Sequence, residues 1–213
     1  SVSESDDNGD GNIDSRYSST NTYDQRGNLL TNVSETDNDG DGTIDSRYSY
    51  TNTYDQRGNQ LTDVYEYDDN ADGTVDSRYS STNTYDQRGN QLTGISESDN
   101  DGDGTIDSRS STTNTYDQRG NLLTGISEGD EGVDGTIDSR NSTTNTYDQS
   151  GNLLTSVSVS EPYYDRGGGF YSRYSSTNTY DQSGNLLTGV SEYDKDGDGK
   201  IDSRYSSTNT YDQ

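Results

Sequence analysis

Residues 33–63 read VSETDNDGDGTIDSRYSYTNTYDQRGNQLTD, and versions of this stretch return along the whole chain. Successive copies begin 31 residues apart, and only the last interval is longer, at 33 residues. The units are therefore 2–32, 33–63, 64–94, 95–125, 126–156, 157–189 and 190–213. Repeats of this length are typical of units that stack on their neighbours, because one unit alone cannot bury an apolar face. The sequence predicts a single repeat array.

Two units depart from the common sequence. The sixth has a two-residue insertion and contains Pro162, Tyr163, Tyr164 and Gly167–Gly169. We interpret it as a joint, a contact point or a decayed copy, and favour the last. The seventh unit stops in mid-repeat at Gln213, as expected of a segment taken from a longer array.

The composition excludes an ordinary globular core. Only 22% of the 213 residues are hydrophobic, and Leu, Ile, Val and Phe together make about 12%. Highly charged chains with less than roughly 20% of these residues are expected to stay disordered. The formal net charge is −26, so a compact state also repels itself. Whatever orders this chain is not apolar burial alone.

Several classes of function are excluded by what the sequence lacks. It contains no His, Cys, Met or Trp, which removes disulfides, Cys/His zinc sites and Ser-His-Asp or Cys-His catalysis. The chain has no apolar run near the ~18 residues of a membrane helix, and its acidity disfavours nucleic acid. Paired carboxylates can hydrolyse glycosides, but here they recur from unit to unit, whereas a catalytic pair is normally unique. We predict that the chain is not an enzyme.

Each unit contains two chain reversals, and the first is a hairpin turn. In Tyr54–Asn59, Asp55 can cap the turn and Gly58 can supply the positive φ that a short hairpin needs. The flanking segments, rich in Thr, Ser, Tyr, Ile and Leu, read as two β-strands. With Tyr54 opposite Asn59, the same register pairs Arg47 with Glu66, Arg16 with Glu35, Arg78 with Glu97 and Arg109 with Glu128.

Strand alternation then predicts a thin core face. Its members in this repeat are Ile44, Ser46, Tyr48, Tyr50, Asn52 and Tyr54, with Leu61 from the partner strand. Burying so few large side chains does not offset the entropy lost on ordering the unit. Val33 falls on the opposite face in this register, and a β-bulge would be needed to correct that.

The second reversal carries the candidate ligands. Asp37, Asp39 and Asp41 alternate, Gly42 permits a sharp turn, and Asp45 closes a nine-residue loop. Carboxylates at positions one, three, five and nine, with the backbone carbonyl of Thr43 at position seven, offer the hard oxygen ligands that calcium prefers. Magnesium tolerates such a loop less well. We expect calcium to supply the stability that the core lacks.

This loop resembles the first nine positions of EF-hand calcium loops and the calcium loops of dockerins and thrombospondin type 3 repeats. The match predicts five sites: Asp6, Asn8, Asp10, Asn12 and Asp14; Asp37, Asp39, Asp41, Thr43 and Asp45; Asp68, Asn70, Asp72, Thr74 and Asp76; Asp99, Asp101, Asp103, Thr105 and Asp107; Asp194, Asp196, Asp198, Lys200 and Asp202. A further, incomplete set is Asp130, Asp134 and Asp138, where Gly132 removes a ligand. The sixth unit has lost the motif.

The twelfth position separates these loops from true EF-hands. The bidentate Glu expected there is replaced by Tyr17, Tyr48, Tyr79, Ser110 or Tyr205. This departure argues against a helix-loop-helix and leaves part of the coordination to water or to a neighbouring unit.

The hairpin half of the repeat, Asn-Thr-Tyr-Asp-Gln-Arg-Gly-Asn-Leu-Leu-Thr, is similar to the YD repeats of Rhs and teneurin-type proteins. The resemblance covers about a third of each unit. It implies a large extracellular or exported β-structure built from successive hairpins. The longer spacing and the acidic loops depart from that family, so a closed shell is not expected.

Two asparagines fit the N-glycosylation sequon, Asn32 in Asn-Val-Ser and Asn141 in Asn-Ser-Thr. Asn141 lies on the predicted core face, so either that sequon is unused or the face is less buried than predicted. Attached glycans, on these residues or on the many Ser and Thr, would shield surface that the poor core leaves wet.

The sequence therefore predicts an all-β tandem array of antiparallel hairpins joined by calcium-binding loops, with a parallel β-solenoid of one unit per coil as the alternative. The predicted function is an extracellular or cell-surface structural protein, a fibre, filament or stalk that self-associates head to tail. The rival is an adhesin segment whose tyrosines and acidic loops bind a glycan or a surface.

Overall fold

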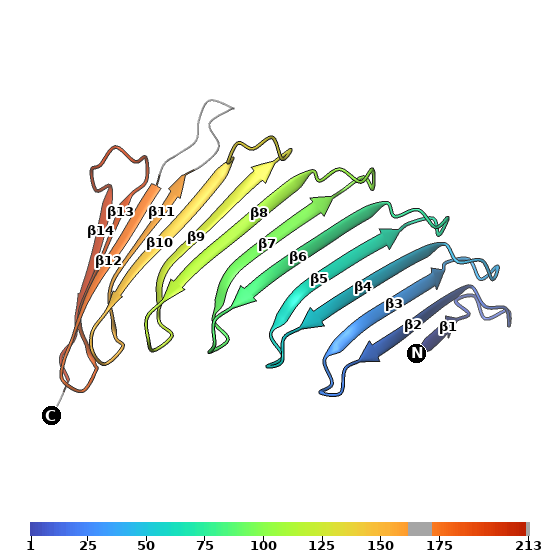
Figure 1. Ribbon diagram of the computed structural model, residues 1–213, viewed down its shortest axis with the longest axis horizontal. Coiled ribbons are helices and arrows are strands. Elements are labelled where there is room, and N and C mark those ends of the chain that lie inside the picture. Colours follow the sequence, from blue (N-terminus) through green and yellow to red (C-terminus); the bar gives the residue numbers. More distant parts are fainter. Residues whose placement is uncertain (162–171, 212–213) are drawn as a thin grey trace. The chain divides into compact units, whose positions relative to one another are not determined.

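The computed structural model describes residues 1–161 and 172–211, and every regular element in them is a β-strand (Figure 1). The strands form one antiparallel sheet in chain order, each between its sequence neighbours, so the alternative of a parallel solenoid is wrong. Their bounds are β1 Val2–Ser5, β2 Ser15–Tyr23, β3 Leu29–Asp37, β4 Ser46–Tyr54, β5 Gln60–Asp68, β6 Ser77–Tyr85, β7 Gln91–Asp99, β8 Ser108–Tyr116, β9 Leu122–Glu131, β10 Ser139–Tyr147, β11 Leu153–Glu161, β12 Ser172–Tyr180, β13 Leu186–Asp194 and β14 Ser203–Thr208.

The chain forms two compact units, residues 1–84 with 94–109 and residues 85–93 with 110–213. Where the connections are described, they alternate between a Tyr-Asp turn at one end of the strands and an acidic loop at the other (Figure 1). The unusual residues of the sixth repeat, Pro162, Tyr163, Tyr164 and Gly167–Gly169, lie outside the described residues. No helix in the described part of the chain has the length and apolarity of a membrane span.

The Tyr-Asp turn has the predicted chemistry. The Asp55 carboxylate accepts hydrogen bonds from the backbone N–H of Arg57 at 2.8 Å and of Asn59 at 2.9 Å, and Gly58 has φ 91°. The side-chain amide of Asn59 donates to the other carboxylate oxygen at 2.9 Å. The pKa of Asp55 is held below its ordinary value, chiefly by this amide bond. Capping by Asp and a left-handed Gly therefore fix the turn.

A β-bulge next to this turn changes the register that we expected. Thr53 pairs with Thr62, but Tyr54 pairs with Gln60, so Leu61 is an extra residue. The predicted pairing of Tyr54 with Asn59 is therefore wrong by one residue, and the bulge adds one more, so Arg47 lies opposite Asp68 and the predicted pairing of Arg47 with Glu66 is wrong. The bulge does not move Val33 to the tyrosine face, because Val33 pairs with Ser49 in β4.

The arginines do form ion pairs with glutamates, but with different partners, across the other reversal. Arg47 pairs with Glu35, on the strand before the acidic loop, with a nitrogen–oxygen distance of 3.9 Å. The corresponding pairs are Arg16–Glu4, Arg78–Glu66, Arg109–Glu97, Arg140–Glu128 and Arg204–Glu192. The pairings of Arg16 with Glu35, Arg78 with Glu97 and Arg109 with Glu128 are corrected accordingly. All these side chains are partly exposed, so each pair adds little stability.

No hydrophobic side chain in the described residues is buried, so the predicted core face does not form an apolar core. Ile44, Tyr48, Tyr54 and Leu61 are half-buried, whereas Asn52 is only 2% exposed. The other buried side chains are polar: Ser34, Asp37, Asp63, Asp68, Asp99, Asp130 and Asp194. None of the described elements forms a second layer over the sheet, which explains why the described residues include no apolar interior.

Hydrogen bonds from the recurring segment Thr-Asn-Thr-Tyr-Asp-Gln join hairpin to hairpin. The Asn52 amide donates to the backbone carbonyl of Leu29, in the preceding hairpin, at 3.0 Å, and the Tyr54 hydroxyl donates to the same oxygen at 3.2 Å. Thr53 bonds the Thr62 hydroxyl across its own hairpin at 2.6 Å. The inter-hairpin pair recurs from Asn114 and Tyr116 to Gln91, from Asn145 and Tyr147 to Leu122, and from Asn178 and Tyr180 to Leu153.

Candidate metal centre

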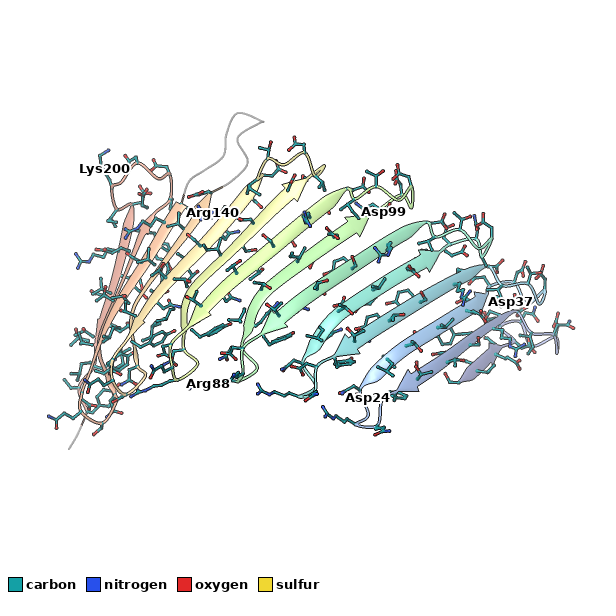
Figure 2. The ribbon with its side chains drawn as sticks, in the orientation of Figure 1. Asp24, Asp37, Arg88, Asp99, Arg140 and Lys200 are labelled. Atoms are coloured by element: carbon teal, nitrogen blue, oxygen red, sulfur yellow. The ribbon has the colours of Figure 1, made fainter. Side chains whose placement is uncertain are left out.

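The acidic loops span residues 6–14 (loop 1), 37–45 (loop 2), 68–76 (loop 3), 99–107 (loop 4), 130–138 (loop 5) and 194–202 (loop 7). In most of them the first aspartate is also the last residue of a strand, which fixes its position and buries it. Asp37 is 3% exposed and Asp99 is 6% exposed. Figure 2 shows both at the loop end of their strands, with Asp24 at the opposite end. The sheet therefore holds one buried carboxylate at the base of loops 2, 3, 4, 5 and 7, whereas Asp6 of loop 1 is exposed.

Backbone N–H groups fold each loop around its carboxylates. In loop 2, Asp37 accepts hydrogen bonds from Gly40 at 2.7 Å and from Gly42 at 2.9 Å. Asp45 accepts the N–H of Asn38 at 2.6 Å, which joins the two ends of the loop. Gly40 and Gly42 have φ of 70° and 87°, so the loop needs residues that tolerate the left-handed region.

Three of the loops gather three carboxylates, with oxygen atoms within 4.8 Å of one another in each cluster. The clusters are Asp37, Asp39 and Asp41 in loop 2; Asp99, Asp101 and Asp107 in loop 4; and Asp194, Asp196 and Asp202 in loop 7. Negative charges at such distances repel, and a divalent cation between them reverses the sign of the interaction.

Unsatisfied oxygens at the loop bases also indicate a cation. The Oδ1 atoms of Asp68, Asp99 and Asp130 are buried and have no hydrogen-bond partner. Leaving a buried acceptor unpaired costs about 1–3 kcal/mol, and more if it is charged. For Asp99 the unpaired oxygen belongs to a residue of the loop 4 cluster. Oxygen ligands of this kind, on a flexible loop, fit calcium.

In loops 2, 3 and 5 the aspartate at the fifth position has a lowered pKa. The backbone N–H of Thr43 donates to Asp41 at 2.7 Å and lowers the pKa of that carboxyl, and the Thr43 side chain lowers it further. Thr74 lowers the pKa of Asp72 in the same way, and Thr136 that of Asp134. A carboxyl that stays charged at lower pH is ready to bind a cation without first losing a proton.

In the structure, predicted ligands at the third and ninth loop positions accept backbone hydrogen bonds from their own loop. At the third position the side-chain oxygen accepts the N–H of the fifth residue, as between Asn8 and Asp10 and between Asn70 and Asp72. The ninth residue accepts the N–H of the second, as in Asp14, Asp76, Asp107 and Asp202. In loop 5 Asp130 is buried and Asp138 accepts the N–H of Glu131, while Gly132 offers no side chain. The carbonyl role of Asn12, Thr43, Thr74, Thr105 and Lys200 stays a prediction.

The sequence reasoning missed two features of the loops. The Lys200 ammonium lies 2.6 Å from Asp198 and lowers the pKa of its carboxyl, so this side chain competes with a cation for the same oxygen. The positive charge inside the loop 7 sequence was the available signal. Adjacent loops also touch, because a Cβ added at Gly40 would lie 1.8 Å from the Ile13 carbonyl oxygen of loop 1. No pattern in the local sequence predicts that contact.

The two sequons differ in their surroundings. Asn141 is exposed, although it was expected on a core face. The Asn32 amide is half-buried and donates to Ser19 at 2.9 Å and to Asn21 at 2.6 Å. Glycosylation of either residue stays a prediction.

Comparisons with known proteins assign no family. No protein-family model matches the chain, and no curated protein matches it. Among solved structures it is similar to the Photorhabdus luminescens Tc holotoxin pore, with 14% identity and a TM-score of 0.31, over 92% of this chain but only 12% of that chain. It is also similar to a porin-like protein from Bacteroides uniformis, with 12% identity and a TM-score of 0.30, over 96% and 90% of the two chains. Both TM-scores are low, so neither similarity carries an argument about function.

Proposed function

We propose that this chain is an extracellular structural repeat protein whose acidic loops bind calcium, and that its hairpins form a fibre, filament or stalk at a cell surface. The observation that carries the proposal is the buried Asp99, whose free oxygen belongs to a cluster of three carboxylates in a sheet without an apolar core. The resemblances to YD-repeat hairpins and to EF-hand-like loops support it.

Calcium is suited to this role by its concentration outside cells. Extracellular calcium modules bind with dissociation constants of about 10⁻⁴–10⁻³ M, so millimolar calcium fills them. Because calcium binds the folded loops and not the unfolded chain, it shifts the folding equilibrium toward the folded state. It also neutralises part of the net charge of −26. Inside a cell, where free calcium is low, the same chain is expected to be more flexible.

Self-association follows from the pairing already present in the array. Each hairpin binds its neighbour through an antiparallel strand and through donors on the Thr-Asn-Thr-Tyr segment. A further copy of the same sequence offers the same edge, and strand edges pair readily with matching strands. The repetition of similar acidic loops, in place of one unique carboxylate pair, supports a structural rather than an enzymatic role.

Calcium titration tests the stability half of this proposal. We expect calorimetry to show about five calcium ions binding per chain, with weaker binding of magnesium. Circular dichroism should show the β signal weakened, or its melting temperature lowered, when a chelator is added. A melting curve that is the same in calcium and in chelator contradicts the proposal.

Electron microscopy tests the fibre half separately. Ordered filaments should form in millimolar calcium and disperse when the chelator is added. Separate single particles under both conditions, with calcium bound, would leave the metal sites standing and exclude the fibre.

A further inference from the structure

A groove of about 420 Å³ crosses the tyrosine face of the first compact unit. Its sides are Tyr17 from β2 and Tyr48 from β4, with Tyr67 of β5 beside Tyr48. Its floor is β3, the strand between β2 and β4, where Ser34 and Thr36 pair with Tyr48 and Tyr17. Strands two apart are about 10 Å from each other, so the two rings flank a channel one sugar ring wide.

The groove depends on which side chains a repeat carries and not on the backbone fold that the repeats share. On β5, one repeat later, Tyr65 stands where β3 has Ser34, and Tyr67 stands where it has Thr36. The Tyr65 ring fills that place, at 6.0 Å from Tyr48 and 5.8 Å from Tyr79. The same location is therefore partly filled by an aromatic ring in one repeat, where a space of about 190 Å³ remains, and more open in the other, at about 420 Å³.

The open groove is uncharged in a strongly charged chain. A quarter of all residues carry a charge, yet the groove is lined by tyrosine, serine, threonine and asparagine alone. Anionic ligands are disfavoured by the net charge of −26, and cations find stronger partners in the acidic loops. The charge distribution thus leaves neutral ligands as the class that fits.

The polar groups of the groove are hydroxyls and an amide at its floor. The Tyr17 hydroxyl and Ser34 Oγ are 3.0 Å apart, and Ser34 donates to the Asn32 side-chain carbonyl at 3.1 Å. Above them Tyr17 is 44% exposed and Tyr67 is 42% exposed. Amphipathic aromatic rings beside a few placed polar groups are typical of small-ligand sites, and the groove volume is in their usual range.

We propose that this groove binds a neutral saccharide. A sugar ring has apolar C–H faces, which pack on tyrosine rings, and a rim of hydroxyls, which bond Asn32, Ser34 and Thr36. The proposal is independent of calcium binding, because none of the groove residues lies in an acidic loop. It gives the adhesin expectation a defined place on the sheet.

Residues at equivalent positions in other repeats suggest the substitutions for the test. Ser34→Tyr copies the residue found at Tyr65 and should fill the groove without disturbing the sheet. Tyr17→Ser copies Ser110, which occupies the same repeat position, and removes one side of the groove. Tyr79→Ser is the matched control, since it removes a tyrosine of similar exposure (38%) outside the groove.

The experiment uses the full chain in calcium on an array of neutral oligosaccharides built from glucose, galactose, mannose and N-acetylglucosamine, with sialylated and sulfated glycans alongside. Calorimetry with the best neutral ligand should show affinity lowered at least roughly tenfold by Ser34→Tyr and by Tyr17→Ser, and within about twofold of the original for Tyr79→Ser. Circular dichroism of each variant confirms that it is folded.

Three outcomes overturn the proposal. The first is no neutral glycan bound, and the second is binding only to acidic glycans. The third is neutral-glycan binding that folded Ser34→Tyr leaves unchanged. If Ser34→Tyr instead lowers the association state in sedimentation while no glycan is bound, the groove is a contact between copies of the chain.

Discussion

At the scale of single residues, the molecule is held by polar side chains in buried places. Asn52 and the first aspartate of every described loop except loop 1 are buried, where a globular protein would place Leu or Val. Each such group needs a partner, and Asn52 finds one in the Leu29 carbonyl. For the Oδ1 atom of Asp99 the missing partner is the cation that we propose. The buried positions are therefore the places where a polar side chain needs a specific hydrogen-bond or metal partner.

Asp99→Asn should change stability in opposite directions with and without calcium. In chelator, the substitution removes one of three mutually repelling charges, so the melting temperature should rise slightly. In millimolar calcium it removes a ligand, and we expect the affinity of loop 4 to fall at least roughly tenfold, about 1.4 kcal/mol. Thermal melts in both conditions and calorimetry measure the effect.

The control for this reversal is Asp69→Asn, in loop 3. It removes one negative charge, as Asp99→Asn does, but at the second loop position, whose side chain is not a predicted ligand. The neighbouring Asp76 carboxyl raises the pKa of Asp69 through a hydrogen bond and through charge repulsion. This variant should gain stability in chelator and keep its calcium affinity. Equal responses of the two variants in calcium would mean that Asp99 does not bind the ion.

The turn aspartates predict a loss of stability in acid. Because the Asn59 amide lowers the pKa of Asp55 below its ordinary 3.8, the ionised carboxylate stabilises the folded chain. This contribution is complete above about pH 5 and is lost as the pH falls through the lowered pKa. Asp55→Asn should thus destabilise the chain at about pH 7 and much less at about pH 2.5, in denaturant titrations at both values. A difference that does not depend on pH contradicts this account.

At the scale of elements, the hairpin is the unit of structure and the contacts between hairpins give it stability. Two strands with a tight turn are marginal alone, and a third strand is needed for independent stability. Here the next hairpin supplies both a strand and the donors of Asn52 and Tyr54. Adjacent loops add a contact at the opposite end, between Gly40 and Ile13.

Asn52→Ala should destabilise the array by about 1–3 kcal/mol, because the buried Asn52 side chain is one of two donors to the Leu29 carbonyl and also accepts the Gln60 amide. The matched control is Asn21→Ala. Asn21 has the same place in the repeat but is exposed, and its Oδ1 accepts one bond from Asn32. We expect the control to cost about 1 kcal/mol or less in denaturant titrations. A control as costly as Asn52→Ala would show that the inter-hairpin bond adds nothing.

Gly40→Ala should cost more than Gly9→Ala, although both residues have the same loop position and similar φ, 70° and 73°. Both variants pay the penalty of a side chain in the left-handed region. Only at Gly40 does the new Cβ meet another loop, at 1.8 Å from the Ile13 oxygen; nothing lies within 4 Å at Gly9. The excess should be about 1–3 kcal/mol in thermal melts. Equal losses would mean that the loops do not touch in solution.

The sequence predicted those parts of the fold that depend on neighbouring residues. The Asp55 and Gly58 turn, the alternating strands and the loop geometry around Asp37 all follow from local chemistry. The register was wrong by two residues: the pairing starts with Tyr54 opposite Gln60 and not Asn59, and the extra residue Leu61 shifts every later pair by one more. No side-chain pattern marks either change. Asn52 was placed on the predicted core face, but its bond to Leu29 was not predicted, because Leu29 is in another hairpin and the bond depends on how hairpins dock.

At the scale of the whole molecule, charge sets the conditions for folding. Forty acidic and fourteen basic residues share a chain with no buried apolar side chain among those described. Screening by simple salt reduces repulsion between exposed charges but does not supply a ligand to a buried carboxylate oxygen. Divalent cations do both, so stability should depend on the kind of ion as well as on ionic strength.

Calcium, magnesium and sodium should therefore raise the melting temperature to different extents at equal ionic strength. A calcium concentration of about 100 times the dissociation constant stabilises by about 2.7 kcal/mol for each independent site. Magnesium should act less, and sodium chloride only through screening. Differential scanning calorimetry of the full chain measures all three. Identical curves at matched ionic strength would reduce the loops to acidic turns.

The bonds from Asn and Tyr to the preceding hairpin have a genetic consequence. Since donor and acceptor occupy the same places in successive copies, loss or duplication of one whole repeat in the gene brings together the same partners as before. The two-residue insertion of the sixth repeat also leaves these partners together, since Asn178 and Tyr180 still bond Leu153. Unequal recombination can thus adjust the length of this protein in steps of one hairpin, with no new interface to evolve.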